Sequence, residues 1–257
     1  MSSLIIALLV FACIFGGALL GMLLSMILPE HHLCKESRET VKVGAGLIAT
    51  MAALVLGLLV GSAKSSFDAM DAGMTEVGAK VILLDRVLAR YGPETADIRD
   101  ALRGAVAATI RKFWPEDALA PQNLEAAARA KGVEPVQARI MELTPKTDTQ
   151  RLLQSQAVQL SGDLAYLRWM LIERKHRSLP TTFIVMLSFW LSMLFCSFGL
   201  FTPRHATVIT VLGISALSVA GALFLILEMN SPLEGVIKIS SGPLQTALSH
   251  LGKGVTP

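Results

Sequence analysis

A short polar loop near the start of the chain holds the residue types that most often bind metal ions. It reads Glu30-His31-His32-Leu33-Cys34-Lys35-Glu36, and imidazole, thiolate and carboxylate groups are the usual ligands of zinc and related metals. The spacing matches no established ligand pattern, and two adjacent imidazoles rarely turn to one ion. We favour a solvent-exposed loop that titrates near neutral pH, with His31, His32 and Cys34 as the alternative metal candidates.

Motifs for catalysis are absent from the sequence. It contains no GxSxG, P-loop, HExxH or GxGxxG pattern, and each of these would position a nucleophile, a phosphate, a zinc ion or a dinucleotide. Only 17% of the residues are charged and the net charge is +3, too little for the concentrated basic face of a nucleic-acid-binding protein. We expect no enzymatic activity, no cofactor and no nucleic-acid partner.

The stretch 43–63 has the composition of a helix that could line an ion-conducting pore, because it is uncharged and rich in glycine. Gly57 and Gly61 form a small-xxx-small pair, which lets helices approach closely. Apolar constrictions can gate a channel by excluding water. The candidates for a pore lining are Ile48, Thr50, Leu54, Gly57, Leu58, Gly61 and Ser62. Alternatively, the glycines only serve close contact between helices of one subunit.

An acidic residue, Glu228, ends the last apolar stretch of the chain. It could mark the membrane boundary, attract cations, or form an ion pair with Arg174 or Arg177. Both arginines lie on the same membrane face as Glu228 in the topology derived below. We treat these three residues as the membrane-edge charges.

Four apolar stretches position these residues. A helix needs about 20 apolar residues to cross a hydrocarbon core of roughly 30 Å, and residues 4–28, 43–63, 179–201 and 206–227 reach that length. The first has no basic n-region and exceeds the apolar core of a signal peptide, so we expect a retained span. The predicted fold class is an all-α integral membrane protein with four transmembrane helices.

The polar region between the second and third spans is predicted to be helical. Two heptad-like stripes occur in it: Met70, Met74, Val77, Val81, Leu84 and Leu88, then Leu153, Ala157, Leu160, Leu164, Leu167 and Leu171. No proline lies between Val43 and Gly92, so we expect spans two and three to extend as long helices, the first by about 40 Å. The stripes could pair as an antiparallel coiled coil or face partner subunits.

The predicted domain organisation follows these patterns. Residues 1–63 and 179–228 form two transmembrane hairpins, 64–178 the helical region, and 229–257 a C-terminal tail. Shorter helices are expected at 94–113, 121–131 and 136–143, and one short strand at 236–240. Lysines and arginines near the membrane are in slight excess on the side of the termini, where Arg168 is one of them. Arg38 and Lys42 lie on the opposite side. By the positive-inside rule we expect the termini and the central region to be cytoplasmic.

Three runs of residues resemble a known family. They are Val43–Leu59, the run Ile82-Leu83-Leu84-Asp85-Arg86-Val87-Leu88-Ala89-Arg90-Tyr91-Gly92-Pro93-Glu94, and Leu227–Gly235. Together they resemble the bestrophin-like domain family of bacterial membrane proteins, which implies a location in a bacterial inner (plasma) membrane. That resemblance implies a distant likeness to bestrophins, which are pentameric anion channels with four spans, cytoplasmic termini and a pore along the second span. Span two here has no aromatic residue and no acidic run follows span four, which departs from bestrophins.

These observations predict an oligomeric bestrophin-like membrane channel for small anions or other small ions, with a pore lined by the second span. Its partners would be the lipid bilayer, further copies of itself in a homo-oligomer, and small ions. The alternative is a non-conducting membrane scaffold or sensor whose cytoplasmic helices bind a partner. The number of subunits discriminates the two, because a monomer or dimer cannot enclose a pore with one helix per subunit.

Overall fold

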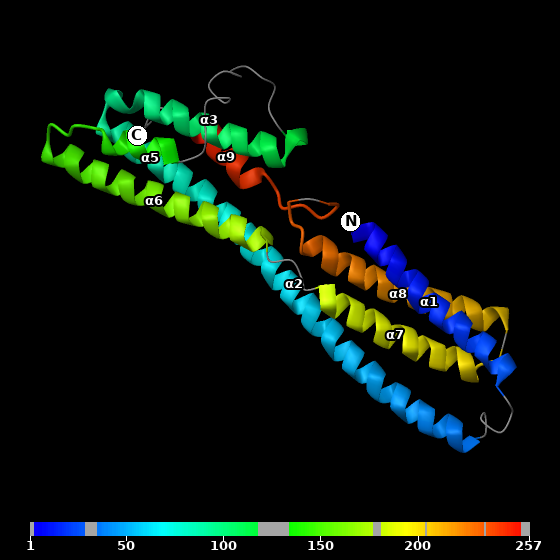
Figure 1. Ribbon diagram of the computed structural model, residues 1–257. Coiled ribbons are helices and arrows are strands. Elements are labelled where there is room, and N and C mark those ends of the chain that lie inside the picture. The colour runs from blue at the N-terminus through cyan, green and yellow to red at the C-terminus, as the bar shows by residue number, and fades with distance from the viewer. Residues whose placement is uncertain are drawn as a thin grey trace. The chain divides into compact units, whose positions relative to one another are not determined.

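The computed structural model describes residues 3–28, 35–117, 134–176, 181–203, 205–233 and 235–252. Within these ranges all regular structure is helical, and no strand occurs (Figure 1). The chain divides into two compact units. Unit 1 comprises residues 1–67 and 178–237, and unit 2 comprises residues 68–177 and 238–257.

Four helices are long and apolar enough to cross a membrane. They are α1 (Ser3–Ile27), α2 (Lys35–Tyr91), α7 (Thr181–Phe201) and α8 (Ala206–Met229). Each coincides with one of the predicted apolar stretches, so the all-helical prediction with four long apolar helices is confirmed. The second begins at Lys35, two turns before residue 43, so part of the predicted loop is already helical.

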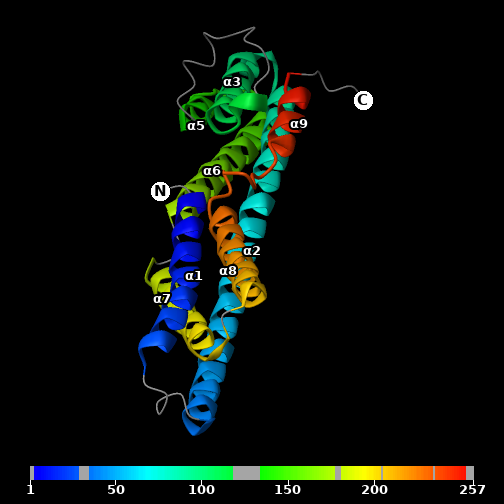
Figure 2. The same cartoon turned by 90° about the vertical axis from the view of Figure 1, so that its right-hand side faces the viewer.

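The core of unit 1 takes side chains from all four of these helices. One apolar face of each helix contributes to it, and most of the remaining surface of each span is exposed in the single chain. In two views a quarter turn apart, α1, α7 and α8 lie side by side (Figure 1, Figure 2). The buried members of this core are Val10, Ile14, Ala18, Ala52, Leu59, Ala63, Leu187, Leu191, Phe195, Ala216, Leu223 and Ile226.

Glycines bring the backbones of α1 and α7 into direct contact. A Cβ atom at Gly17 would lie 2.6 Å from the carbonyl oxygen of Ser192. Gly21 lies even closer to the backbone of Cys196, and Gly199 of α7 lies against the backbone of Ala18. Because the neighbouring atoms are backbone, they cannot rotate away, and any side chain at these positions would push the two helices apart.

In unit 2 the second half of α2 runs antiparallel to α6 (Asp148–His176). The end of α2 contacts the start of α6, and an earlier part of α2 contacts a later part of α6. The Gln150 side chain donates to the carbonyl of Tyr91 over 3.1 Å, and Lys80 lies 2.6 Å from Asp163. The two heptad-like stripes therefore face each other within the chain: Met70, Met74, Val81, Leu84, Leu88, Ala157, Leu164 and Leu167 are all buried.

Shorter helices complete unit 2. A single turn, η2 (Pro93–Thr95), leads into α3 (Ala96–Phe113), a second turn, η3 (Pro115–Asp117), follows, and α5 (Glu134–Met141) precedes α6. The helices predicted at 94–113 and 136–143 correspond to α3 and α5. The helix predicted at 121–131 lies outside the described residues.

The C-terminal segment differs from its prediction. No strand forms at Val236–Ser240, because the backbone there bonds to side chains instead: the Trp114 indole donates to the Ile239 carbonyl over 2.7 Å. A helix that the sequence pattern did not predict, α9 (Gly242–His250), follows. It lies against α2 where Gly78 has no side chain, since a Cβ there would sit 2.8 Å from the carbonyl oxygen of Pro243.

The predicted extension of span two is confirmed, because α2 is one helix of 57 residues. The extension of span three stays a prediction. Helix α6 ends at His176 and α7 begins at Thr181, and the join at 177–180 lies outside the described residues.

Candidate functional site

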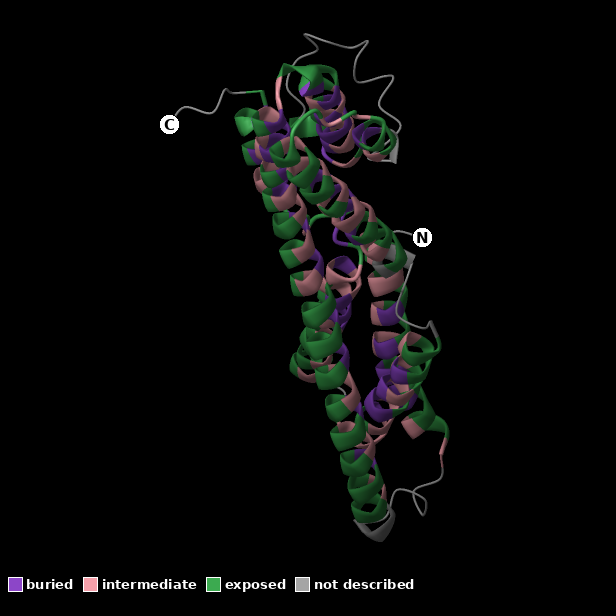
Figure 3. Cartoon of the chain, turned by 90° about the vertical axis from the view of Figure 1, so that its left-hand side faces the viewer, coloured by how far each residue is buried: buried purple, intermediate pink, exposed green. Residues whose placement is uncertain are grey.

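One side of α2 in unit 1 is buried and the opposite side is open. Ala45, Ala52, Leu59 and Ala63 are buried, and their spacing of seven, seven and four residues places them on a single face. The opposite face is exposed and apolar, and Leu54 keeps 73% of its surface accessible. Figure 3 shows this exposed side of α2 in green. In a membrane-spanning helix such a face must meet lipid, another subunit or a pore.

Six of the seven residues predicted as a pore lining lie on the exposed side of α2. They are Thr50, Leu54, Gly57, Leu58, Gly61 and Ser62, whereas Ile48 is half-buried at the edge of the core-facing side. The hydroxyl of Thr50 donates to the carbonyl of Leu47 over 2.8 Å. This bond within the helix satisfies the polar group in an apolar setting.

Gly57 and Gly61 do not mediate contact between the described helices. Apart from the neighbouring backbone of α2 itself, no described atom lies within 4 Å of a Cβ built at either glycine. The close-contact glycines are instead Gly17, Gly21 and Gly199 in α1 and α7, which the sequence reasoning missed. The signal was present, because Gly17 and Gly21 form the same small-xxx-small pair in the first span.

Small and bulky residues both occur along the open face of α2. Thr50, Leu54, Gly57 and Gly61 are spaced four, three and four residues apart, so they share one side of the helix. Leu58 is exposed at 69% and flanks this row. No charged residue occurs between 43 and 63. The face therefore offers exposed bulky apolar side chains beside small residues, and no fixed charge.

The other predicted site residues divide into described and undescribed groups. Glu228 is buried at 4% exposure, and its carboxylate accepts a hydrogen bond from the backbone N–H of Val236 at 2.5 Å. The side chain of Arg174 and all of Arg177 lie outside the described residues. So do His31, His32 and Cys34, and the described part of the chain contains no group of three potential metal ligands.

Glu228 fixes the turn that follows α8. Gly235 has a φ of 114°, a region that favours glycine, and a Cβ there would lie 3.0 Å from the carboxyl carbon of Glu228. The carboxylate thus fills the space that a side chain at position 235 would need. This explains structurally why glutamate and glycine occur together in the run Leu227–Gly235.

The Asp-Arg…Tyr-Gly-Pro-Glu run turns the chain from α2 into α3. Asp85, at 2% exposure, accepts two hydrogen bonds from the Arg99 guanidinium at 2.7 and 3.0 Å. These bonds raise the pKa of Arg99. Gly92 ends α2 with a φ of 143°, and the buried Thr95 hydroxyl donates to the Leu88 carbonyl over 2.6 Å. The most specific run of the sequence therefore serves the architecture of unit 2.

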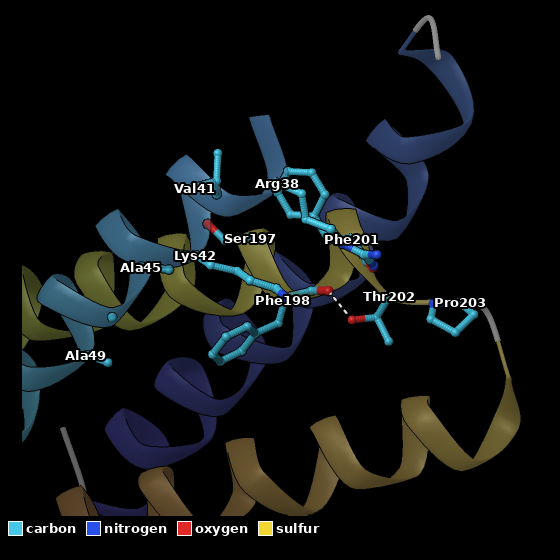
Figure 4. A pocket seen from close by; sticks show the side chains of 11 residues that line it. Arg38, Val41, Lys42, Ala45, Ala49, Ser197, Phe198, Phe201, Thr202 and Pro203 are labelled. Atoms are coloured by element: carbon cyan, nitrogen blue, oxygen red, sulfur yellow. Dashed lines mark hydrogen bonds between the residues drawn. The ribbon is translucent and has the colours of Figure 1, made fainter. Parts of the chain in front are cut away.

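A basic pocket lies between the start of α2 and the end of α7, both in unit 1. It encloses about 390 Å³. Figure 4 shows Arg38 and Lys42 reaching from α2 toward the last turns of α7. The Arg38 guanidinium lies 5.9 Å from the centre of the Phe201 ring and donates to the Phe201 carbonyl. The sequence reasoning treated these cations only as boundary charges.

The architecture of this chain is similar to that of a bacterial protein of known structure. Three crystal structures of a bacterial bestrophin homologue from Klebsiella pneumoniae, each with a single substitution, share its fold. The first has 14% identity and a TM-score of 0.59, and the match covers 93% of this chain and 97% of that one. The second has 15% identity and a TM-score of 0.56, covering 93% and 98%. No protein of curated function matches.

The family comparison covers most of the chain. The family model described as the bestrophin-like domain matches residues 12–244. That range includes all of α2, α7 and α8, most of α1 and most of unit 2. The bestrophin fold and four apolar helices agree with that match. The chain is a membrane protein that belongs to the bestrophin-like domain family.

Proposed function

We propose that this protein is an oligomeric channel for small ions, with a pore lined by the exposed face of α2. The observation that carries the proposal is that Gly57 and Gly61 are not covered by any other described helix. Both lie in a membrane-spanning helix, and no atom of the described chain covers them. A ring of subunits would bring several copies of this face around one axis and enclose an uncharged path.

The proposed lining suits a gated path better than an open one. Leu54 and Leu58 would form apolar rings, and such rings exclude water when the bore is narrow. Thr50 and Ser62 would supply hydroxyls near either end, while Gly57 and Gly61 would let neighbouring helices approach or widen the bore. Because no fixed charge lies on this face, a preference for anions rests on the family likeness alone.

The proposed setting is a bacterial inner membrane with both termini and unit 2 on the cytoplasmic side. The basis is the excess of lysine and arginine near the spans on that side. Glu228 would lie at the cytoplasmic membrane edge, where its bond to Val236 N–H holds the turn after α8. No ionisable side chain is needed within the spans, in keeping with passive conduction.

The scaffold or sensor alternative has less support. Its basis was two heptad-like stripes that might bind a partner. Those stripes are buried against each other in α2 and α6, as the Lys80–Asp163 contact illustrates. A partner would need a different surface of unit 2.

Recording currents from the purified full-length protein in planar bilayers tests the proposal. We expect discrete single-channel steps, and particles seen by electron microscopy to be rings of four or more subunits. A homogeneous sample that passes no current over a wide range of pH, salt and voltage would refute conduction. A monomer or dimer in the membrane would refute a pore lined by one α2 per subunit.

A further inference from the structure

The pocket between α2 and α7 has a basic end and an apolar end. Arg38 and Lys42 lie on the first two turns of α2, near Thr202, the residue that follows α7. One to two turns further into the span the lining becomes Ala45, Ala49 and Phe198. The cavity therefore changes from cationic to hydrocarbon-like along the direction in which a membrane changes from headgroup to acyl chain.

The cations in this pocket use few of their N–H donors within the described part of the chain. The guanidinium of Arg38 carries five N–H donors, and the described residues take one of them through the Phe201 carbonyl. The Lys42 ammonium lies on the same helix face one turn away and is exposed. Among the described residues that line the pocket, none is acidic. The pocket is thus ready to accept an anion from outside the chain.

We propose that this pocket binds an anionic phospholipid, with the headgroup phosphate between Arg38 and Lys42 and one acyl chain against Ala45, Ala49 and Phe198. An arginine fork matches the geometry of phosphate oxygens. The first turn of α2 adds the positive end of its helix dipole. A volume of about 390 Å³ lies within the range of small-molecule sites.

A lipid fits this lining better than a free anion does. A dissolved phosphate would use only the basic end and leave the apolar half of the cavity unfilled. A phospholipid fills both halves, and its phosphate sits at the membrane depth where a span gives way to its polar flank. The proposal concerns binding alone and does not depend on whether the protein conducts.

Native mass spectrometry of the delipidated full-length protein tests this proposal. Phosphatidylglycerol and phosphatidylcholine with identical acyl chains are titrated separately, and inorganic phosphate serves as the free-anion probe. We expect phosphatidylglycerol to bind clearly more tightly than phosphatidylcholine. Since each basic residue near an anionic membrane contributes several-fold in affinity, the double variant Arg38→Gln/Lys42→Gln should lose at least about tenfold for phosphatidylglycerol.

Two further variants separate the parts of the proposal. Arg90→Gln/Arg139→Gln removes the same charge from exposed positions in unit 2, and should bind phosphatidylglycerol like the unmodified protein. Ala49→Leu fills the apolar end and should weaken phosphatidylglycerol binding while both basic residues remain. Circular dichroism and size-exclusion profiles verify folding, and Lys42→Gln alone replaces the double variant if that variant misfolds.

Several outcomes would overturn the lipid site. Equal binding of the two lipids would show that the anionic headgroup is not recognised. Equal losses in the pocket variant and its charge-matched control would show a general charge effect. Displacement of phosphatidylglycerol by millimolar inorganic phosphate, with no effect of Ala49→Leu, would identify a free-anion site in its place.

Discussion

Glu228 shows how a residue that sequence reasoning treats as a boundary charge can have a defined local task. Its carboxylate is buried and accepts from Val236 N–H, and it occupies the space beside Gly235. The sequence indicates a charge at the end of a span. It does not indicate a partner eight residues away, because that contact depends on the positive φ of Gly235, which only the folded chain displays.

Replacing Gly235 by alanine should destabilise unit 1. The new Cβ would meet the Glu228 carboxyl and force a φ that side chains rarely adopt, at a cost of about 1–3 kcal/mol. The measurement is the thermal unfolding midpoint in detergent. Gly221→Ala is the control, since no described atom lies within 4 Å of its Cβ, and an equal loss in both variants would contradict this account.

The Asp85–Arg99 pair gives a second prediction for single residues. Asp85→Asn removes the charge that neutralises Arg99 in a largely buried site. Breaking such a pair costs about 3 kcal/mol, so the unfolding midpoint should drop markedly. The double variant Asp85→Leu/Arg99→Met removes both charges and should be much less destabilised. A double variant as unstable as Asp85→Asn would show that hydrogen-bond geometry, rather than an unpaired charge, sets the cost.

Among the elements, the contact between α1 and α7 depends on glycine and that between α2 and α6 on side chains. Sequence patterns predicted the second contact, because heptad-like stripes are recognisable by period alone. They did not identify the first, because a small-xxx-small pair occurs in both α1 and α2. Which pair is used in the subunit depends on which helix faces meet, and local sequence does not record that.

Gly21→Ala should therefore destabilise the protein, and Gly61→Ala should not. At position 21 the Cβ would collide with the backbone of Cys196, and overpacking of this kind costs about 1–3 kcal/mol. At position 61 the space is open, and alanine improves helix propensity by up to about 1 kcal/mol. Thermal unfolding of dispersed subunits distinguishes the two, and equal destabilisation would contradict the assignment.

The contact between α2 and α6 should also respond to alkaline pH. The hydrogen bond with Asp163 raises the pKa of Lys80 above its ordinary 10.5. The Lys80–Asp163 interaction therefore contributes its full stabilisation below pH 10.5. That stabilisation is lost as pH rises through the raised pKa of Lys80. Lys80→Met should cost less than about 1 kcal/mol at pH 8, because Asp163 is partly exposed, and the difference from the unmodified protein should vanish at strongly alkaline pH.

For the whole molecule, the open face of α2 makes the proposed pore testable by one substitution. Leu58→Thr exchanges an apolar constriction for a wettable side chain, so the barrier to water and ions should fall. We expect a higher open probability or conductance in single-channel recordings. Leu217→Thr, on the exposed side of α8, is the control. Unchanged currents in Leu58→Thr, with assembly intact, would exclude Leu58 from the constriction.

Composition and hydropathy predicted the helical class and the four long apolar helices, because membrane spans are defined by length and polarity alone. They did not predict α9 or the strand-free segment before it. That segment is fixed by contacts from distant residues, such as Trp114 to the Ile239 carbonyl. The basic pocket was missed for the same reason: Arg38 and Phe201 are brought together only by the fold.

The glycine contact between α1 and α7 bears on how the protein is made. Gly21 and Gly199 are about 180 residues apart in the chain, and synthesis adds roughly 5–20 residues per second. For about 9–36 s the first helix must therefore stay in the bilayer before α7 exists to cover its glycine face. During that interval other helices with small-residue faces can compete for it, so membrane insertion factors that shield α1 should raise the yield of folded protein.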